Sequence, residues 1–138
     1  MKYLAVVFDL FGTLAGNFSS QGYNDALAQM ASALSLPTED FRRVWFATSR
    51  ERNTGTSQNC ETDVEYICRE FGVPLEVEQI QLAVRCRLDY IRHVMTPQPG
   101  SVDVLSRLKE EGYKTALLSN CSHEIPVVWP ETLFAPLT

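Results

Sequence analysis

An aspartate near the N-terminus follows directly on an apolar segment. Asp9 comes after residues 3–8, whose β-branched and aromatic side chains are typical of a strand buried on both faces of a parallel sheet. Gly12 then indicates a tight turn, and Thr13 adds a hydroxyl group. Ligands of open α/β sheets bind at the carboxyl ends of the strands, where Asp9 would lie. A carboxylate held there can attack an electrophile to form an ester or an acyl phosphate, and it can also bind Mg²⁺.

A second apolar segment ends in small polar residues. Residues 115–118 form a short strand-like run, and Ser119 and Asn120 follow it. If this strand pairs in parallel with the first, its carboxyl end lies at the same edge of the sheet as Asp9. Ser119 and Asn120 could then donate hydrogen bonds to an anionic group that Asp9 attacks.

The intervening segments indicate how these residues are positioned. Apolar residues recur at helical spacing through most of residues 23–95, and a linker rich in proline, residues 96–100, follows. We expect Thr38 to cap the second of four helices in a small bundle. A strand, a bundle, then a helix and a strand predict a parallel α/β sheet with a helical insertion after its first strand. The expected helices are residues 23–34, 38–48, 62–71, 77–94 and 102–111, with residues 52–59 as a connection.

The composition is typical of a globular protein and argues against several classes of function. Of the 138 residues, 45% are hydrophobic and 21% are charged, and the net charge of −5 disfavours a nucleic-acid-binding surface. The longest apolar runs are too short to cross a bilayer, and the first of them is better interpreted as a strand than as a signal peptide. We therefore expect a cytoplasmic protein with a small-molecule substrate and with no nucleic-acid or membrane partner.

The cysteines indicate neither a disulfide framework nor a metal site. No two of the four lie at CxxC spacing, so free thiols in a reducing compartment are expected. Cys68 and Cys86 are interpreted as small buried residues on helices. Cys121 and His123 lie close together, but two candidate ligands are too few for a zinc site.

Other charged residues are weaker candidates for a functional site. Arg50 and Arg52 lie near a loop and could reach a carboxylate-bearing substrate, although a solvated helix end is the preferred interpretation. His93 and His123 have no acidic or serine partner at a readable spacing, so we predict no role for them.

The order of these segments resembles one superfamily. The motif FDLFGTL (residues 8–14), the helical insertion, the linker, an amphipathic helix and ALLSN (residues 116–120) are together similar to the haloacid dehalogenase-like hydrolases that carry a helical cap after their first motif. The resemblance runs over essentially the whole chain. It implies a partial Rossmann-like parallel core, residues 1–15 and 96–138, with a helical-bundle cap, residues 16–95.

The resemblance also implies a role for each residue of the two motifs. Asp9 would be the nucleophile, and Thr13 would support the loop and the attacked group. Ser119 would bind phosphate or carboxylate oxygens, and Asn120 matches the Ser-Asn form of the dehalogenase-like branch. In Mg²⁺-dependent members, Asp9 and the main-chain carbonyl of Phe11 would bind the metal.

Phe11 departs from the pattern of the phosphatases in this superfamily. Those enzymes usually carry a second aspartate at this position, which protonates the leaving oxygen and then activates water. A phenylalanine can do neither, whereas a halide leaving group needs no proton. Phe11 therefore favours the dehalogenase-like branch or a phosphatase with altered chemistry.

The later motifs of the superfamily have no counterpart in this chain. They supply a lysine and acidic residues, but the 18 residues after Asn120 contain no lysine and no aspartate. Two strands are also fewer than the core of the superfamily has, and Trp129 and Phe134 are expected to need a partner surface. These features indicate a truncated form with exposed strand edges, for which self-association is plausible.

Two functional hypotheses remain open. The first is a hydrolase that uses Asp9 on a phosphate ester or a haloacid-type substrate, with Mg²⁺ if it is a phosphatase. The second is a non-catalytic truncated isoform or interaction module that keeps the helical bundle. The motifs around Asp9 and Ser119 favour descent from the first, and the missing lysine favours the second.

Overall fold

Two short strands pair in parallel in the α/β part of the molecule. The computed structural model describes residues 3–138, so the first two residues of the predicted core lie outside the described range. Strand β1 (Ala5–Phe8) pairs with β2 (Lys114–Leu117), and Phe8 lies opposite Leu117. The parallel pairing that the sequence predicts is confirmed.

Helix α6 (Ser101–Glu110) leads into β2 and packs against it. Gly100 precedes this helix with a φ of 82°, and Gly112 follows it with the same φ. Glycine adopts this left-handed conformation without the strain that a side chain would introduce. Leu105, on the inner face of the helix, is fully buried.

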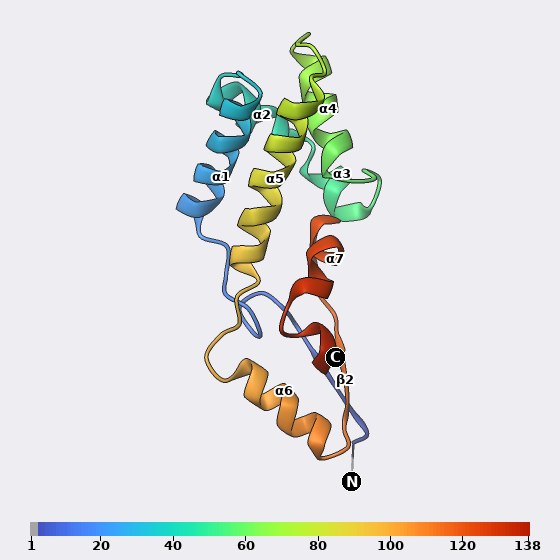
Figure 1. The fold of residues 1–138 in the computed structure, drawn as a ribbon. Coiled ribbons are helices and arrows are strands. Elements are labelled where there is room, and N and C mark those ends of the chain that lie inside the picture. The colour runs from blue at the N-terminus through green and yellow to red at the C-terminus, as the bar shows by residue number, and fades with distance from the viewer. Residues whose placement is uncertain (1–2) are drawn as a thin grey trace.

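Within residues 3–138, five helices form the cap, one more than the sequence predicts. Helices α1 (Ser20–Ala33) and α5 (Val77–Val94) lie side by side and run antiparallel (Figure 1). The additional helix is α3 (Ser49–Thr54), and residues 52–59 are therefore only partly a connection. The remaining two helices are α2 (Thr38–Ala47) and α4 (Cys60–Glu70).

The start of α4 has a complete capping box. The backbone N–H of Thr62 donates to Asn59 Oδ1 at 2.9 Å, and the N–H of Asn59 donates to Thr62 Oγ1 at 3.3 Å. These bonds satisfy donors that have no partner inside the helix. The prediction that Thr38 caps α2 is wrong, because Pro37 is the N-cap residue and Thr38 is the first helical residue. The proline ring restricts φ, and Pro37 has a φ of −60° in an extended backbone with no side-chain hydrogen bond to the helix.

The buried apolar residues form two cores. The cap core contains Phe41 and Trp45, both fully buried and stacked with ring centroids 5.8 Å apart. The second core lies under the strands and α6 and contains Leu10. Helix α5 takes part in both, because Ile80 lies in the cap core and Ile91 in the second one. Continuous packing along α5 therefore joins the two parts of the molecule.

The C-terminal residues fold back onto the second core. They form α7 (Glu124–Val128) and two 3₁₀ turns, η1 (Trp129–Glu131) and η2 (Ala135–Leu137). Phe134 is fully buried, and Trp129 stacks on it with ring centroids 5.9 Å apart. The expectation that these two residues need a partner surface is therefore wrong, because the chain itself covers them.

The two connections between the α/β part and the cap run together. Ala15 and Pro97 form an isolated antiparallel bridge, and the N–H of Gln98 donates to the carbonyl of Leu14 at 2.8 Å. The chain thus enters and leaves the cap at one place, between Leu14 and Gln98.

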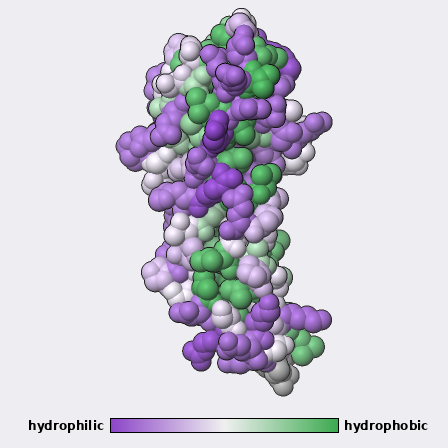
Figure 2. Space-filling view, viewed as in Figure 1, coloured by the Kyte–Doolittle hydropathy of each residue, from purple (hydrophilic) through white to green (hydrophobic). Residues whose placement is uncertain are grey.

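The surface differs between the two parts of the molecule. Hydrophilic residues cover most of the cap, whereas a hydrophobic area lies over the α/β part on the same face (Figure 2). Val7 on β1 is 61% exposed and Leu118, just after β2, is 75% exposed, so one side of the sheet is open to solvent. None of the helices within residues 3–138 combines the length and apolar character that a bilayer span requires.

Candidate active site

Asp9 and Ser119 follow the paired strands at one edge of the sheet. The N–H of Leu118 donates to the carbonyl of Phe8 at 2.9 Å, so the two chains leave the sheet side by side. Asp9 is exposed. The Ser119 hydroxyl is buried and has no hydrogen-bond partner among the described residues. Buried hydroxyl groups are usually hydrogen-bonded, so this one is available to a bound group.

The loop after Asp9 is held by its own backbone. The N–H groups of Leu14 and Ala15 both donate to the carbonyl of Leu10, at 2.9 and 3.0 Å. Gly12 adopts a φ of 76°, and a Cβ added there would lie 2.8 Å from Asn17 Oδ1. The glycine is therefore required both by the left-handed backbone and by the close approach of Asn17.

The predicted site residues are not all brought to one place. Asn120 lines a cavity of about 180 Å³ between the cap and the α/β part, together with Phe11. Thr13 is exposed and lines a different hollow, beside Gly100 at the start of α6. Asp9 lines neither hollow, so its contact with a substrate and the role of Thr13 stay predictions.

The cavity combines aromatic, polar and cationic walls. Phe11 and Phe18 meet at one side, with ring centroids 4.5 Å apart. Two arginines, Arg52 and Arg87, come from the cap, and none of the described residues that line it is acidic. The other lining residues are Tyr23, Ser49, Asn53, Asn120, Cys121, Ser122 and Ile125.

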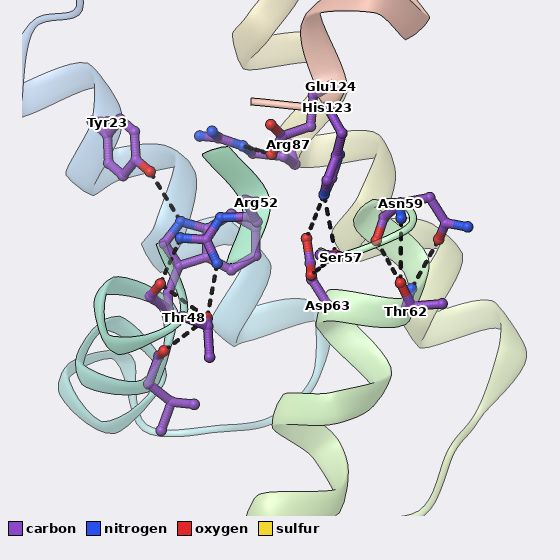
Figure 3. A network of polar contacts seen from close by, with 12 residues as sticks. Tyr23, Thr48, Arg52, Ser57, Asn59, Thr62, Asp63, Arg87, His123 and Glu124 are labelled. Atoms are coloured by element: carbon purple, nitrogen blue, oxygen red, sulfur yellow. Dashed lines mark hydrogen bonds and ion pairs between the residues drawn. The ribbon is translucent and has the colours of Figure 1, made fainter. Parts of the chain in front are cut away.

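Arg52 is buried, and the interpretation of it as a solvated helix end is wrong. Its side chain is 3% exposed, and Nη2 donates to the carbonyl of Trp45 at 2.5 Å while Nη1 donates to Thr48 Oγ1 at 2.8 Å (Figure 3). Its Cζ lies 4.0 Å from the centre of the Trp45 ring. Burial lowers the pKa of Arg52 below its ordinary value, although the guanidinium remains charged. Arg50, on the same helix, is exposed as predicted.

Arg87 forms a buried ion pair with Glu124 across the boundary between the cap and α7. Arg87 Nε donates to Glu124 Oε1 at 2.9 Å, and the two side chains are 3% and 0% exposed. Burial raises the pKa of Glu124, but the charge of Arg87 and hydrogen bonds from Ser122 and Arg87 outweigh it, so the pKa lies below the ordinary value. Nη1 of Arg87 is also buried and has no partner among the described residues.

His123, for which the sequence predicts no role, joins the α/β part to the cap. His123 Nε2 lies 2.8 Å from Asp63 Oδ2 and 3.4 Å from Ser57 Oγ (Figure 3). Ser57 Oγ in turn donates to Asp63 Oδ1. Ser57 and Asp63 both contact the same imidazole nitrogen, which differs from a catalytic triad, where serine and aspartate bind opposite nitrogens. This contact is therefore a structural link between Asp63 on α4 and the loop after Asn120.

The sequence contained one signal for Arg87 that periodicity alone did not resolve. Arg87 lies four residues after Ala83 and four before Ile91, and all three are buried on α5. A charged residue at a buried helical position usually has a charged partner. That partner is 37 residues away in the chain, so only the fold could identify it.

Comparison with protein families decides the identity of this fold. The model of the haloacid dehalogenase-like hydrolase family matches residues 3–129. The chain belongs to this family. As a haloacid dehalogenase-like hydrolase, it has a partial Rossmann-like α/β core with a helical cap, as the sequence predicts.

One curated relative is a dehalogenase. The (S)-2-haloacid dehalogenase H-109 of Pseudomonas putida is 26% identical over 121 residues, which cover 86% of this chain and 52% of that protein. This chain thus spans about half the length of that relative.

Two solved structures are also similar. A hydrolase from Pseudomonas syringae is 18% identical with a TM-score of 0.42, and the match covers 95% of this chain and 56% of that one. A predicted phosphoglycolate phosphatase from Haemophilus somnus is 17% identical with a TM-score of 0.41, over 99% and 60% of the two chains.

The expected metal ligands form an incomplete set. Hydrolases of this family generally use Mg²⁺. In this chain the candidates are the Asp9 carboxylate and the carbonyl of Phe11, and no group of three His, Cys, Asp or Glu side chains within residues 3–138 is placed to hold a metal ion. Mg²⁺ prefers six oxygen ligands in octahedral geometry, so these two donors do not make a site by themselves.

Proposed function

We propose that this haloacid dehalogenase-like hydrolase uses Asp9 as a nucleophile on a small phosphate ester or haloacid-type substrate. The observation that carries the proposal is the placement of Asp9 and Ser119 directly after two strands that end side by side, with the Ser119 hydroxyl buried and unpaired among the described residues. A carboxylate and a hydrogen-bond donor at one sheet edge suit attack on a bound anionic substrate.

The two candidate substrates differ in their leaving group. With a haloacid, a carboxylate oxygen of Asp9 forms an ester bond to the carbon, and the halide leaves with the bonding electrons. With a phosphate ester, Asp9 forms an acyl phosphate, and the leaving alkoxide takes up a proton. Water then hydrolyses either intermediate and restores the carboxylate. Because Phe11 cannot supply that proton, the chain's own residues suit the halide better.

Several finer assignments belong to the same proposal. Thr13 supports the loop, and Ser119 and Asn120 bind the anionic group. A phosphate ester would also call for Mg²⁺, for which Asp9 and the Phe11 carbonyl supply only two of the six ligands. The core comprises residues 1–15 and 96–138 and the cap residues 16–95. The protein acts in the cytoplasm without nucleic acid or membrane. The activity in the name of the Pseudomonas putida relative supports a haloacid as the substrate.

Turnover by the purified chain tests the proposal. Halide release from a 2-haloacid and hydrolysis of an aryl phosphate with Mg²⁺ are measured in parallel for the wild type and for Asp9→Asn. Asp103→Asn, which changes an exposed aspartate on α6, serves as the control. Turnover that Asp9→Asn abolishes and Asp103→Asn preserves supports the proposal. Turnover that survives in Asp9→Asn contradicts it.

The second candidate function is a non-catalytic interaction module. The open side of the sheet, with Val7 and Leu118 exposed, is the observation that favours it. Under this hypothesis the folded wild type shows no turnover in either assay. Light scattering then tests self-association through this surface, which Leu118→Lys should weaken.

A further inference from the structure

The cavity between the cap and the α/β part carries a surplus of positive charge on its walls. Arg52 and Arg87 line it from α3 and α5, and within residues 3–138 no acidic side chain belongs to its lining. Glu124, the partner of Arg87, is fully buried and approaches from α7 without lining the cavity. The cavity wall therefore has two guanidinium groups that face a common space.

Arg87 keeps an unused donor in this buried position. Its Nε is bonded to Glu124, but its Nη1 has no partner among the described residues, although the side chain is only 3% exposed. A buried charged donor without an acceptor is costly, so it favours a bound acceptor. Two guanidinium groups are well suited to the planar oxygen pair of a carboxylate or to a phosphate.

The position of the cavity connects it with the predicted reacting groups. Phe11 lies two residues after Asp9, Asn120 directly follows Ser119, and both line the cavity. Phe18 and Ile125 supply apolar walls, and Asn120 and Ser122 supply further polar groups. A volume of about 180 Å³ suits a small ligand.

We infer that Arg52 and Arg87 bind an oxyanion group of the substrate in this cavity and so select small acids. This inference rests on the proposed function, because it deepens the substrate class of the same site. Arg52 is already oriented by the Trp45 carbonyl and Thr48, and Arg87 by Glu124, so both guanidinium groups are fixed before the ligand binds.

Binding can be measured without any turnover. Arg52 lies 4.0 Å and Arg87 5.3 Å from the centre of the Trp45 ring, so tryptophan emission should report an anion held between them. The other tryptophan is removed by Trp129→Phe, and ionic strength is held constant with sodium chloride. Malonate and inorganic phosphate are titrated separately, which distinguishes a carboxylate from a phosphate as the preferred group.

The variants separate specific binding from general attraction. Arg52→Gln should weaken anion binding about tenfold or more, the loss expected for one charge-assisted hydrogen bond. Arg50→Gln, on the same helix but exposed, should leave it unchanged. Arg87→Lys keeps the charge beside Glu124 and should weaken binding through loss of the planar donor pair. Folding of each variant is verified by circular dichroism.

The outcomes distinguish this inference from the proposed function. Saturable binding of malonate or phosphate that depends on Arg52 but not on Arg50 supports it, whether or not Asp9 supports turnover. An absence of saturable binding of either anion overturns it, and so does equal weakening by the Arg50 and Arg52 variants. Asp9→Asn should retain anion binding, so a failed nucleophile and a failed anion site give different results.

Discussion

Arg87 Nε donates to Glu124 Oε1 at 2.9 Å in a fully buried ion pair that joins α5 of the cap to α7. A second link, from His123 to Asp63, lies one residue away in the chain and reaches α4. Both links begin in the segment that follows Ser119 and Asn120. The position of the cap is therefore coupled directly to the loop that carries two predicted substrate ligands.

The buried pair should be costly to break from one side. Arg87→Met leaves Glu124 charged and unpaired, so we expect it to reduce the free energy of unfolding by about 3–5 kcal/mol. The double variant Arg87→Met/Glu124→Leu removes both charges and should recover most of that loss. Urea unfolding followed by circular dichroism measures both. A double variant no more stable than Arg87→Met would contradict the assignment of Arg87 and Glu124 as a buried ion pair.

Stability should depend on pH through Glu124. Its pKa is lower in the folded chain than its ordinary value of about 4.3, so its contribution is complete above that value. The contribution is lost as the pH falls through the lowered folded pKa, because the unfolded state then binds more protons. The difference in unfolding free energy between the wild type and Arg87→Met/Glu124→Leu should therefore shrink as the pH falls from 6 toward 3. A difference that is constant across this range is the contrary result.

Gly12 should not tolerate a side chain. Gly12→Ala places an alanine at a φ of 76° and brings its Cβ 2.8 Å from Asn17 Oδ1. The left-handed backbone alone should cost about 1–2 kcal/mol. Adding Asn17→Ala should remove the steric part of the loss and leave the backbone part, as thermal unfolding can show. A Gly12→Ala chain as stable as the wild type would be incompatible with this turn.

The C-terminal residues should contribute to the stability of the second core. Phe134→Ala removes a fully buried ring, and we expect a loss of about 3–5 kcal/mol. Leu133→Ala is the matched control, since Leu133 is 63% exposed and its truncation should change stability by about 0.5 kcal/mol or less. Equal effects of the two variants would show that the tail does not pack as described.

Local pattern was sufficient for most of the secondary structure. Helix α5 begins at Val77 and ends at Val94, as its apolar stripe predicts, because periodicity and terminal residues act over a few positions. The sequence does not predict helix α3, because its six residues are all polar and show no apolar period. Its buried residue is Arg52. Its burial depends on the Trp45 ring and carbonyl, which belong to the preceding helix.

The sequence by itself determined the family motifs, the parallel order of the strands and the position of Asp9 and Ser119 at one sheet edge, since these follow from contiguous residues and the direction of each strand. Only the tertiary structure decided that Arg52 and Arg87 share a cavity, that Glu124 pairs with Arg87, and that His123 meets Asp63. The two residues of each of these pairs are 35 to 60 positions apart in the sequence. A buried charge is tolerated only where the fold brings a counter-charge or a hydrogen-bond acceptor to it.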